Sequence, residues 1–167
     1  MRRPILILVN TIYHVCAALW IGSLIGIGAM AAPAAFQTLG RGAGSPAGII
    51  IGEAFKWANT SSFACLAIML AVGVFELSYR KRVNTKRLLM ARLLLTGVAL
   101  LIVLYLSQQL MPQMEIRRAI GDMASFDRMH RAYSDIARLE VLLGVALIAL
   151  TNAVNIGPRR EGGHPRH

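Results

Sequence analysis

The stretch from Ile5 to Ala32 is apolar and contains no charged side chain. Crossing the ~30 Å hydrocarbon core of a bilayer takes about 20 mainly apolar residues in a helix. Three more stretches qualify, at residues 58–78, 88–111 and 139–156, the last being the weakest because Thr151, Asn152 and Asn155 dilute it. Helices satisfy their backbone hydrogen bonds internally, as hydrocarbon requires. The sequence therefore predicts an all-α integral membrane bundle of four spans.

The composition agrees with a membrane location. Apolar residues make up 56% of the 167 residues, charged residues make up 16%, and the mean hydropathy is +0.55. A typical soluble domain carries a larger charged fraction, about a quarter. We therefore expect one transmembrane domain over residues 1–157. The remaining tail, 158–167, is predicted to be a disordered cytoplasmic segment.

The net charge of +10 does not indicate nucleic-acid binding, because the apolar spans keep the basic residues from forming one folded face. Lys and Arg collect on the cytoplasmic side of transmembrane helices, so the pattern predicts both termini in the cytoplasm of a multi-pass protein, with the bacterial inner membrane as its location and the lipid bilayer as its partner. Ten basic residues lie before the first span, between the second and third, and after the fourth: Arg2, Arg3, Arg80, Lys81, Arg82, Lys86, Arg87, Arg159, Arg160 and Arg166.

Two segments outside the spans have their own expected structure. Ser45 followed by Pro46 is a typical helix start, with serine as the N-cap and proline in the first turn. The segment 112–135 is too polar for hydrocarbon, but its apolar residues recur at helical spacing. We interpret it either as an amphipathic outer helix before the fourth span or as a continuation of the third helix, bent at Pro112.

Glu76 and Arg92 are charged residues within the predicted spans, where such residues call for partners. Glu76 lies about one turn inside the end of the second span, and Arg92 about one turn inside the start of the third. A short loop makes these helices antiparallel neighbours, so we expect an intramembrane ion pair. A role in moving a proton or an ion, with His130 as a further participant, is the transport alternative.

His14 lies near mid-membrane, and we expect it to form a hydrogen bond between helices. Nearby Gly22 and Gly26 allow a close helix contact, as do Gly48 and Gly52, either within the bundle or with a second copy. The alternative is a haem- or copper-binding redox protein, because His-x5-Trp-x-Gly in a first span resembles copper-resistance D-type proteins and a haem-containing protoporphyrinogen oxidase. A second imidazole at matching depth is missing from the sequence, so we expect no cofactor.

The remaining reactive side chains do not suggest catalysis. Cys16 and Cys65 lie in spans that run in opposite directions, and we expect them at different depths, without a disulfide or a zinc site. Catalytic triads, phosphate loops and paired catalytic carboxylates are not apparent in the sequence. We therefore expect a protein that is not an enzyme.

Two regions of the sequence resemble a known family. They are APAAFQTL with AGIIIGEAF, at 32–39 and 47–55, and MPQMEIRR with FDRMHRAYSDIARLEVLLGV, at 111–118 and 126–145. Together they are similar to the four-helix membrane domain of unknown function shared by many bacterial proteins and by animal transmembrane protein 205. The resemblance implies a four-helix integral membrane protein, and it implies no reaction.

The motif residues map to the outer ends of helices, where we expect a possible pocket. The alternative is that the phenylalanines simply plug the end of the bundle while His130 and Ser134 cap the fourth helix. The leading function hypothesis is a structural or accessory subunit, or a small binding or transport component. The candidate pocket residues are Pro33, Phe36, Glu53, Phe55, Phe126, His130 and Ser134.

Overall fold

The computed structural model of the chain describes residues 3–40, 44–79 and 83–156, and in these residues every regular element is a helix. The helices join into four long rods, each long and apolar enough to cross a membrane. The predicted all-α fold with four helices that could span a membrane is therefore confirmed, while the predicted tail at 158–167 lies outside the described residues. The rods are α1 (Arg3–Ile25), η1 (Gly26–Ala31) and α2 (Ala32–Thr38); α3 (Pro46–Tyr79); α4 (Val83–Tyr105), η2 (Leu106–Leu110) and α5 (Met111–Ala119); and α6 (Met123–Ile156).

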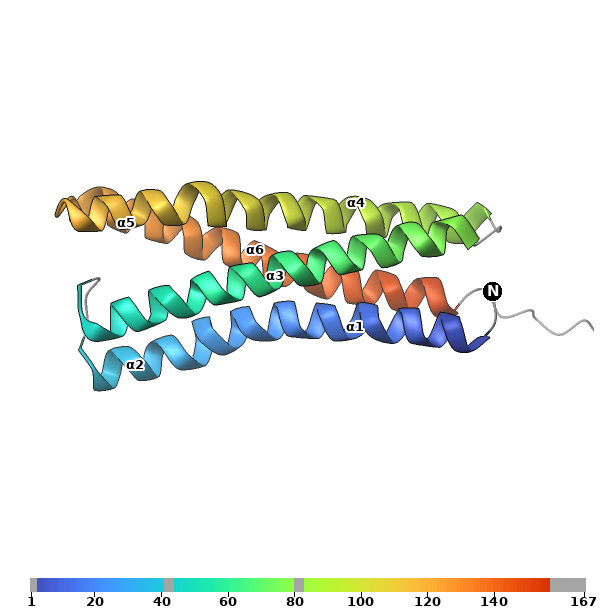
Figure 1. The fold of residues 1–167 in the computed structure, drawn as a ribbon, viewed down its shortest axis with the longest axis horizontal. Coiled ribbons are helices and arrows are strands. Elements are labelled where there is room, and N and C mark those ends of the chain that lie inside the picture. Colours follow the sequence, from blue (N-terminus) through green and yellow to red (C-terminus); the bar gives the residue numbers. More distant parts are fainter. Residues whose placement is uncertain (1–2, 41–43, 80–82, 157–167) are drawn as a thin grey trace, which may run out of the picture.

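The rods lie roughly along one axis, and the start of α1 and the end of α6 share one end of the bundle (Figure 1). We call this the proximal end, and we call the opposite end, which holds α2 and α5, the distal end. At the proximal end the first rod packs against α3 and α6. Toward the distal end α2 packs against α3 and diverges from α6 (Figure 1). The first and fourth rods thus form a V that opens at the distal end.

Two rods begin earlier than the apolar spans suggest. Helix α3 starts at Pro46, as the sequence predicts, with the Ser45 hydroxyl accepting a hydrogen bond from the Gly48 backbone N–H at 3.2 Å. This is the N-cap that the sequence predicts. Helix α6 starts at Met123 and runs unbroken through the fourth apolar stretch. The extra turns are polar enough to lie beyond the hydrocarbon.

The polar segment 112–135 is a continuation of the third rod and then of the fourth, rather than a separate helix. Helix α5 follows η2 directly, and Gly121 reverses the chain with a φ of +76°, a conformation that favours glycine. The Asp122 carboxylate then accepts a hydrogen bond from the Ser125 backbone N–H at 3.1 Å. The contacts with Ser125 hold the pKa of Asp122 below its usual value. Asp122 therefore caps α6.

Each of the two interrupted rods contains a π-helical turn just before a proline. Pro33 follows η1, and Pro112 follows η2. Proline has no backbone N–H, and its ring crowds the carbonyl four residues earlier. A wider turn relieves this conflict without ending the helix. Both rods are therefore reshaped at similar heights in the distal half of the bundle.

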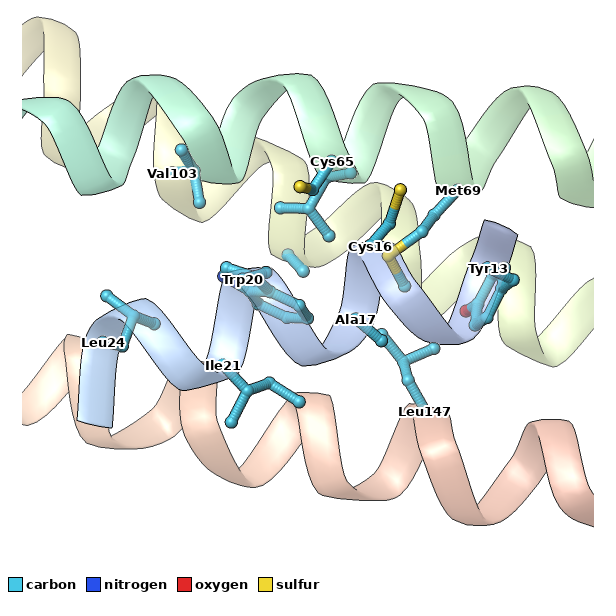
Figure 2. Packing of buried hydrophobic residues seen from close by; sticks show 12 residues of the cluster. Tyr13, Cys16, Ala17, Trp20, Ile21, Leu24, Cys65, Met69, Val103 and Leu147 are labelled. Carbon is cyan, nitrogen blue, oxygen red and sulfur yellow. The ribbon is translucent and has the colours of Figure 1, made fainter. Parts of the chain in front are cut away.

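The apolar core occupies the middle of the bundle and is assembled around one face of α1 (Figure 2). Cys16 and Cys65 belong to it, and their thiols hydrogen-bond to each other across the α1–α3 seam. The expectation of different depths is therefore wrong: α3 ends level with the start of α1, so the two cysteines lie equally far from the proximal end. The buried members are Tyr13, Cys16, Ala17, Trp20, Ile21, Leu24, Cys65, Leu66, Met69, Ala99, Val103 and Leu147.

Close helix contacts occur at two glycines that the sequence analysis did not single out. A Cβ at Gly144 of α6 would run into the Ile21 side chain of α1, and a Cβ at Gly73 of α3 would meet Leu93 of α4. By contrast, a Cβ at Gly22 or Gly26 would meet no atom within 4 Å. The Gly22 and Gly26 pair is therefore not a packing contact within this chain.

Gly144→Ala tests the close packing of α6 on α1. The added methyl group has to displace the buried Ile21, so we expect a loss of about 1–3 kcal/mol in the free energy of unfolding, measured by thermal or denaturant unfolding in detergent. Gly97→Ala is the matched control, because its Cβ would enter open space, and alanine favours a helix over glycine. Equal stability of the two variants would contradict this packing.

Candidate binding pocket and buried polar residues

A pocket of about 630 Å³ lies at the distal end, inside the V between the first and fourth rods. All four rods contribute to its wall, and most of the lining is apolar. The π turn η1 and the start of α2 form one side, and α5 with α6 form the other. The lining includes Leu24, Ile25, Gly28, Ala29, Ala32, Phe36, Gly48, Ile51, Gly52, Phe55, Met111, Met114, Phe126, His130, Tyr133, Ser134, Ala137 and Val141.

The structure brings together most of the pocket residues that the sequence suggested. Phe36, Phe55, Phe126, His130 and Ser134 all line the cavity. Two predicted members lie elsewhere. Pro33 is exposed on α2 and does not line the cavity, and Glu53 is exposed and forms an ion pair with Lys56 at 2.7 Å. Glu53 misses the pocket because it faces outward on α3, one position beyond the pocket-lining Gly52.

The aromatic side chains of the pocket are held by each other and by polar contacts. The Phe55 ring meets Tyr133 edge to face at 5.6 Å between centroids, and Phe126 stacks on the His130 imidazole at 5.9 Å. The Tyr133 hydroxyl donates to the side-chain oxygen of Asn59 at 3.3 Å. These contacts leave the apolar faces of the rings to line the cavity.

Charged side chains lie along one side of the pocket. Glu115 and Arg118 come from α5, and Asp127 and Arg138 come from α6. Lys56 on α3 pairs with Glu115 at 2.5 Å. The cavity is therefore amphipathic, with an apolar interior and an edge that carries both signs of charge.

A buried polar cluster at the proximal half connects all four rods. Glu76 of α3 and Arg92 of α4 form the predicted ion pair, and each side chain is 1% exposed. The Arg92 guanidinium lies over the Tyr13 ring of α1, 4.3 Å from its centroid, an arrangement that stabilises the cation. The Tyr13 hydroxyl contacts Thr96 of α4 at 3.3 Å and also bonds Thr151 of α6. We call these five residues the four-rod polar cluster.

His14 forms a hydrogen bond between helices, as the sequence suggested. Its Nδ1 lies 2.8 Å from the Asn10 carbonyl oxygen, and its Nε2 lies 3.4 Å from the side-chain oxygen of Asn152 on α6. Both ring nitrogens are thus directed at protein atoms. Among the described residues, no three His, Cys, Asp or Glu side chains gather where they could hold a metal ion. Haem or copper binding at His14 remains a hypothesis without a second protein ligand.

One buried acid escaped the sequence analysis. Glu140 of α6 is completely buried, and neither carboxyl oxygen has a hydrogen-bond partner among the described residues. The Trp20 indole N–H is in the same situation. The signal in the sequence is Glu140 itself, an acidic residue one position inside the apolar stretch 139–156. Thr151, Asn152 and Asn155 are the other polar residues of the same stretch.

Removing the cation of the buried ion pair tests the four-rod polar cluster. Arg92→Gln leaves the Glu76 carboxylate buried without its counter-charge, so we expect a loss of about 3–5 kcal/mol in the free energy of unfolding. Adding Glu76→Gln should recover much of this loss, since the remaining amides are neutral. Thermal unfolding in detergent measures both variants.

Arg138→Gln is the matched control for Arg92→Gln. Its ion pair with Asp135 is exposed on α6, and such pairs contribute less than about 1 kcal/mol. Equal destabilisation by the two substitutions would show that the buried Glu76–Arg92 pair contributes no more to the free energy of unfolding than an exposed pair does.

Comparisons with known proteins give the chain a family but no activity. Searches of curated proteins and of solved structures give no significant match for the chain. The match to a protein family covers residues 15–121, which run from the middle of α1 to the turn before α6. It gives no link to transmembrane protein 205. Because it spans more than half of the sequence, the chain belongs to the family described as Domain of unknown function (DUF4149).

Proposed function

We propose that this chain is a non-enzymatic membrane protein that binds an amphiphilic molecule, with a hydrocarbon portion and a charged head group, in the distal pocket. The observation that carries the proposal is the pocket itself, an apolar cavity of about 630 Å³ with charged side chains on one side. Small-molecule sites commonly have volumes of about 300–1,000 Å³ and mostly apolar linings. The size and lining of the pocket therefore suit such a ligand.

The position of the pocket also supports an amphiphile over a fully water-soluble ligand. The pocket is lined by residues of the first and fourth rods, which are both long and apolar enough to span a membrane. A molecule already dissolved in the bilayer would approach it without crossing water. Its hydrocarbon portion would meet Leu24, Ile51 and Phe55, and its head group would meet Arg118 and Asp127.

The chemistry of the pocket suits holding a ligand better than converting one. Most of its lining is aliphatic and aromatic, as in sites that hold a ligand by apolar contact. The imidazole of His130, which also lines the pocket, is stacked on the Phe126 ring. This supports a binding or transport component, or an accessory subunit that presents a bound amphiphile.

The wider setting of this proposal is a multi-pass protein of a bacterial inner membrane with both termini in the cytoplasm. The distribution of Lys and Arg supports that orientation, as does the return of α6 to the end where α1 begins. Kinship with the transmembrane-protein-205-like family, suggested by motifs around Phe55 and His130, is part of the proposal. Open space beside Gly22 and Gly26 leaves room for a second copy.

Gly52→Phe tests the binding function directly. Gly52 lines the pocket, and a Cβ there would enter open space, so a phenyl group can fill the cavity without disturbing its wall. We expect binding of a fluorescent long-chain fatty acid to the purified protein to weaken about tenfold, equivalent to about 1.4 kcal/mol. Gly97→Phe, placed away from the pocket, should bind normally. Equal binding by both variants would contradict the proposal.

Reporter fusions test the proposed orientation. A reporter inserted near residue 84 should report the cytoplasm, because the surrounding residues are strongly basic. A reporter inserted at Gly121, in the turn between α5 and α6, should report the opposite side. Activity of both reporters on one side of the membrane would exclude the four-span topology.

A further inference from the structure

Glu140 differs from the other buried charged and hydroxyl side chains because no hydrogen bond or counter-charge offsets the cost of burying its carboxyl group. The hydroxyls of Ser62, Thr96 and Thr151 each donate to a backbone carbonyl four residues earlier. Glu76 and Arg92 neutralise each other. The Glu140 side chain is 0% exposed, and both of its oxygens are without a hydrogen-bond partner in the described residues.

A carboxyl group in this setting is far more stable as a neutral acid than as an anion. Burying an unpaired ion in a medium of low dielectric constant is very costly, and the group takes up a proton instead. The acid lies within the candidate span Met123–Ala153, where ionisable residues are rare and generally functional. A hydrocarbon side chain would fill this place at no such cost.

Glu140 shares one face of α6 with a residue of the pocket. Tyr133 lies seven residues earlier on α6, a spacing of nearly two turns that places both side chains on that face. Tyr133 lines the pocket and bonds Asn59 of α3. One turn beyond Glu140, a Cβ at Gly144 would lie 3.5 Å from the ring of Trp20, whose indole N–H also has no hydrogen-bond partner among the described residues.

We propose that Glu140 is an intramembrane proton-binding site, which carries its proton at neutral pH. The Tyr133 hydroxyl donates its hydrogen to Asn59 and does not bond Glu140, whose two oxygens have no hydrogen-bond partner among the described residues.

The other titratable groups that face the core do not supply a counter-charge for Glu140. Arg92 of α4 is engaged by Glu76 of α3 and by the Tyr13 ring of α1, and Cys16 of α1 and Cys65 of α3 hydrogen-bond to each other. A metal cation fits less well than a proton, because no group of three suitable ligands occurs among the described residues. The proposal stands independently of the amphiphile.

Infrared difference spectroscopy of the purified full-length protein tests the proposal. A protonated carboxyl group has a carbonyl stretch that a carboxylate lacks. The usual pKa of a glutamate is about 4.3, so exposed acids are ionised at pH 7. We expect the wild-type protein to show the protonated-carboxyl band at pH 7 and Glu140→Gln to lose it. Glu53→Gln, which changes an exposed acid, is the control and should keep the band.

Each result bears on the proposal. The absence of the band from the wild-type protein at pH 7, or its persistence in folded Glu140→Gln, would overturn the proton-binding site. If Glu140→Gln does not fold, the wild-type band still decides the matter, because the remaining acids in the described residues are accessible to water or ion-paired.

Discussion

The exclusion of polar groups from hydrocarbon explains most of the internal arrangement of this bundle. Its large apolar side chains are widely exposed along the outside, among them Leu19, Leu94 and Leu142, where lipid would surround them. Its buried positions include Asn, Ser, Thr, Glu and Arg. In hydrocarbon, helices gain little from burying further apolar surface, and packing and polar contacts hold them together. The four-rod polar cluster meets this requirement, since its five residues come from all four rods.

The bundle is tight toward one end and open at the other for identifiable reasons. Gly144 lets α6 approach Ile21 of α1 closely, and the four-rod polar cluster lies on the proximal side of this contact. In the distal half, Pro33 and Pro112 follow π turns that reshape the first and third rods. The pocket occupies the space between these reshaped segments and α6. A rigid proximal half and an open distal half are a suitable combination for a membrane-facing binding site.

Predictions that depended on local sequence or on depth in the membrane agree with the structure. The Ser45 cap follows from the position of one helix boundary. The Glu76–Arg92 pair and the contact of His14 with α6 follow from the depth of these residues in the membrane. The prediction for the cysteines was wrong. Cys16 lies 11 residues after the start of the first predicted span and Cys65 lies 13 residues before the end of the second, and in antiparallel helices these distances correspond to similar depths. Glu140 was not predicted as a buried acid, although it lies within the fourth predicted span.

The sequence by itself determined that the chain forms four apolar helices, because the length and composition of a membrane span are dictated by the thickness of the bilayer. It also indicated which aromatic residues gather at one end, since these lie near the ends of consecutive helices. Only the tertiary structure decided which faces meet. The rotation of each rod about its axis places Gly144 and Gly73, rather than Gly22 and Gly26, at close helix contacts. It also turns Glu53 away from the pocket and buries Glu140 in the core. Such rotations result from the simultaneous fit of side chains from several helices, and no single segment encodes them.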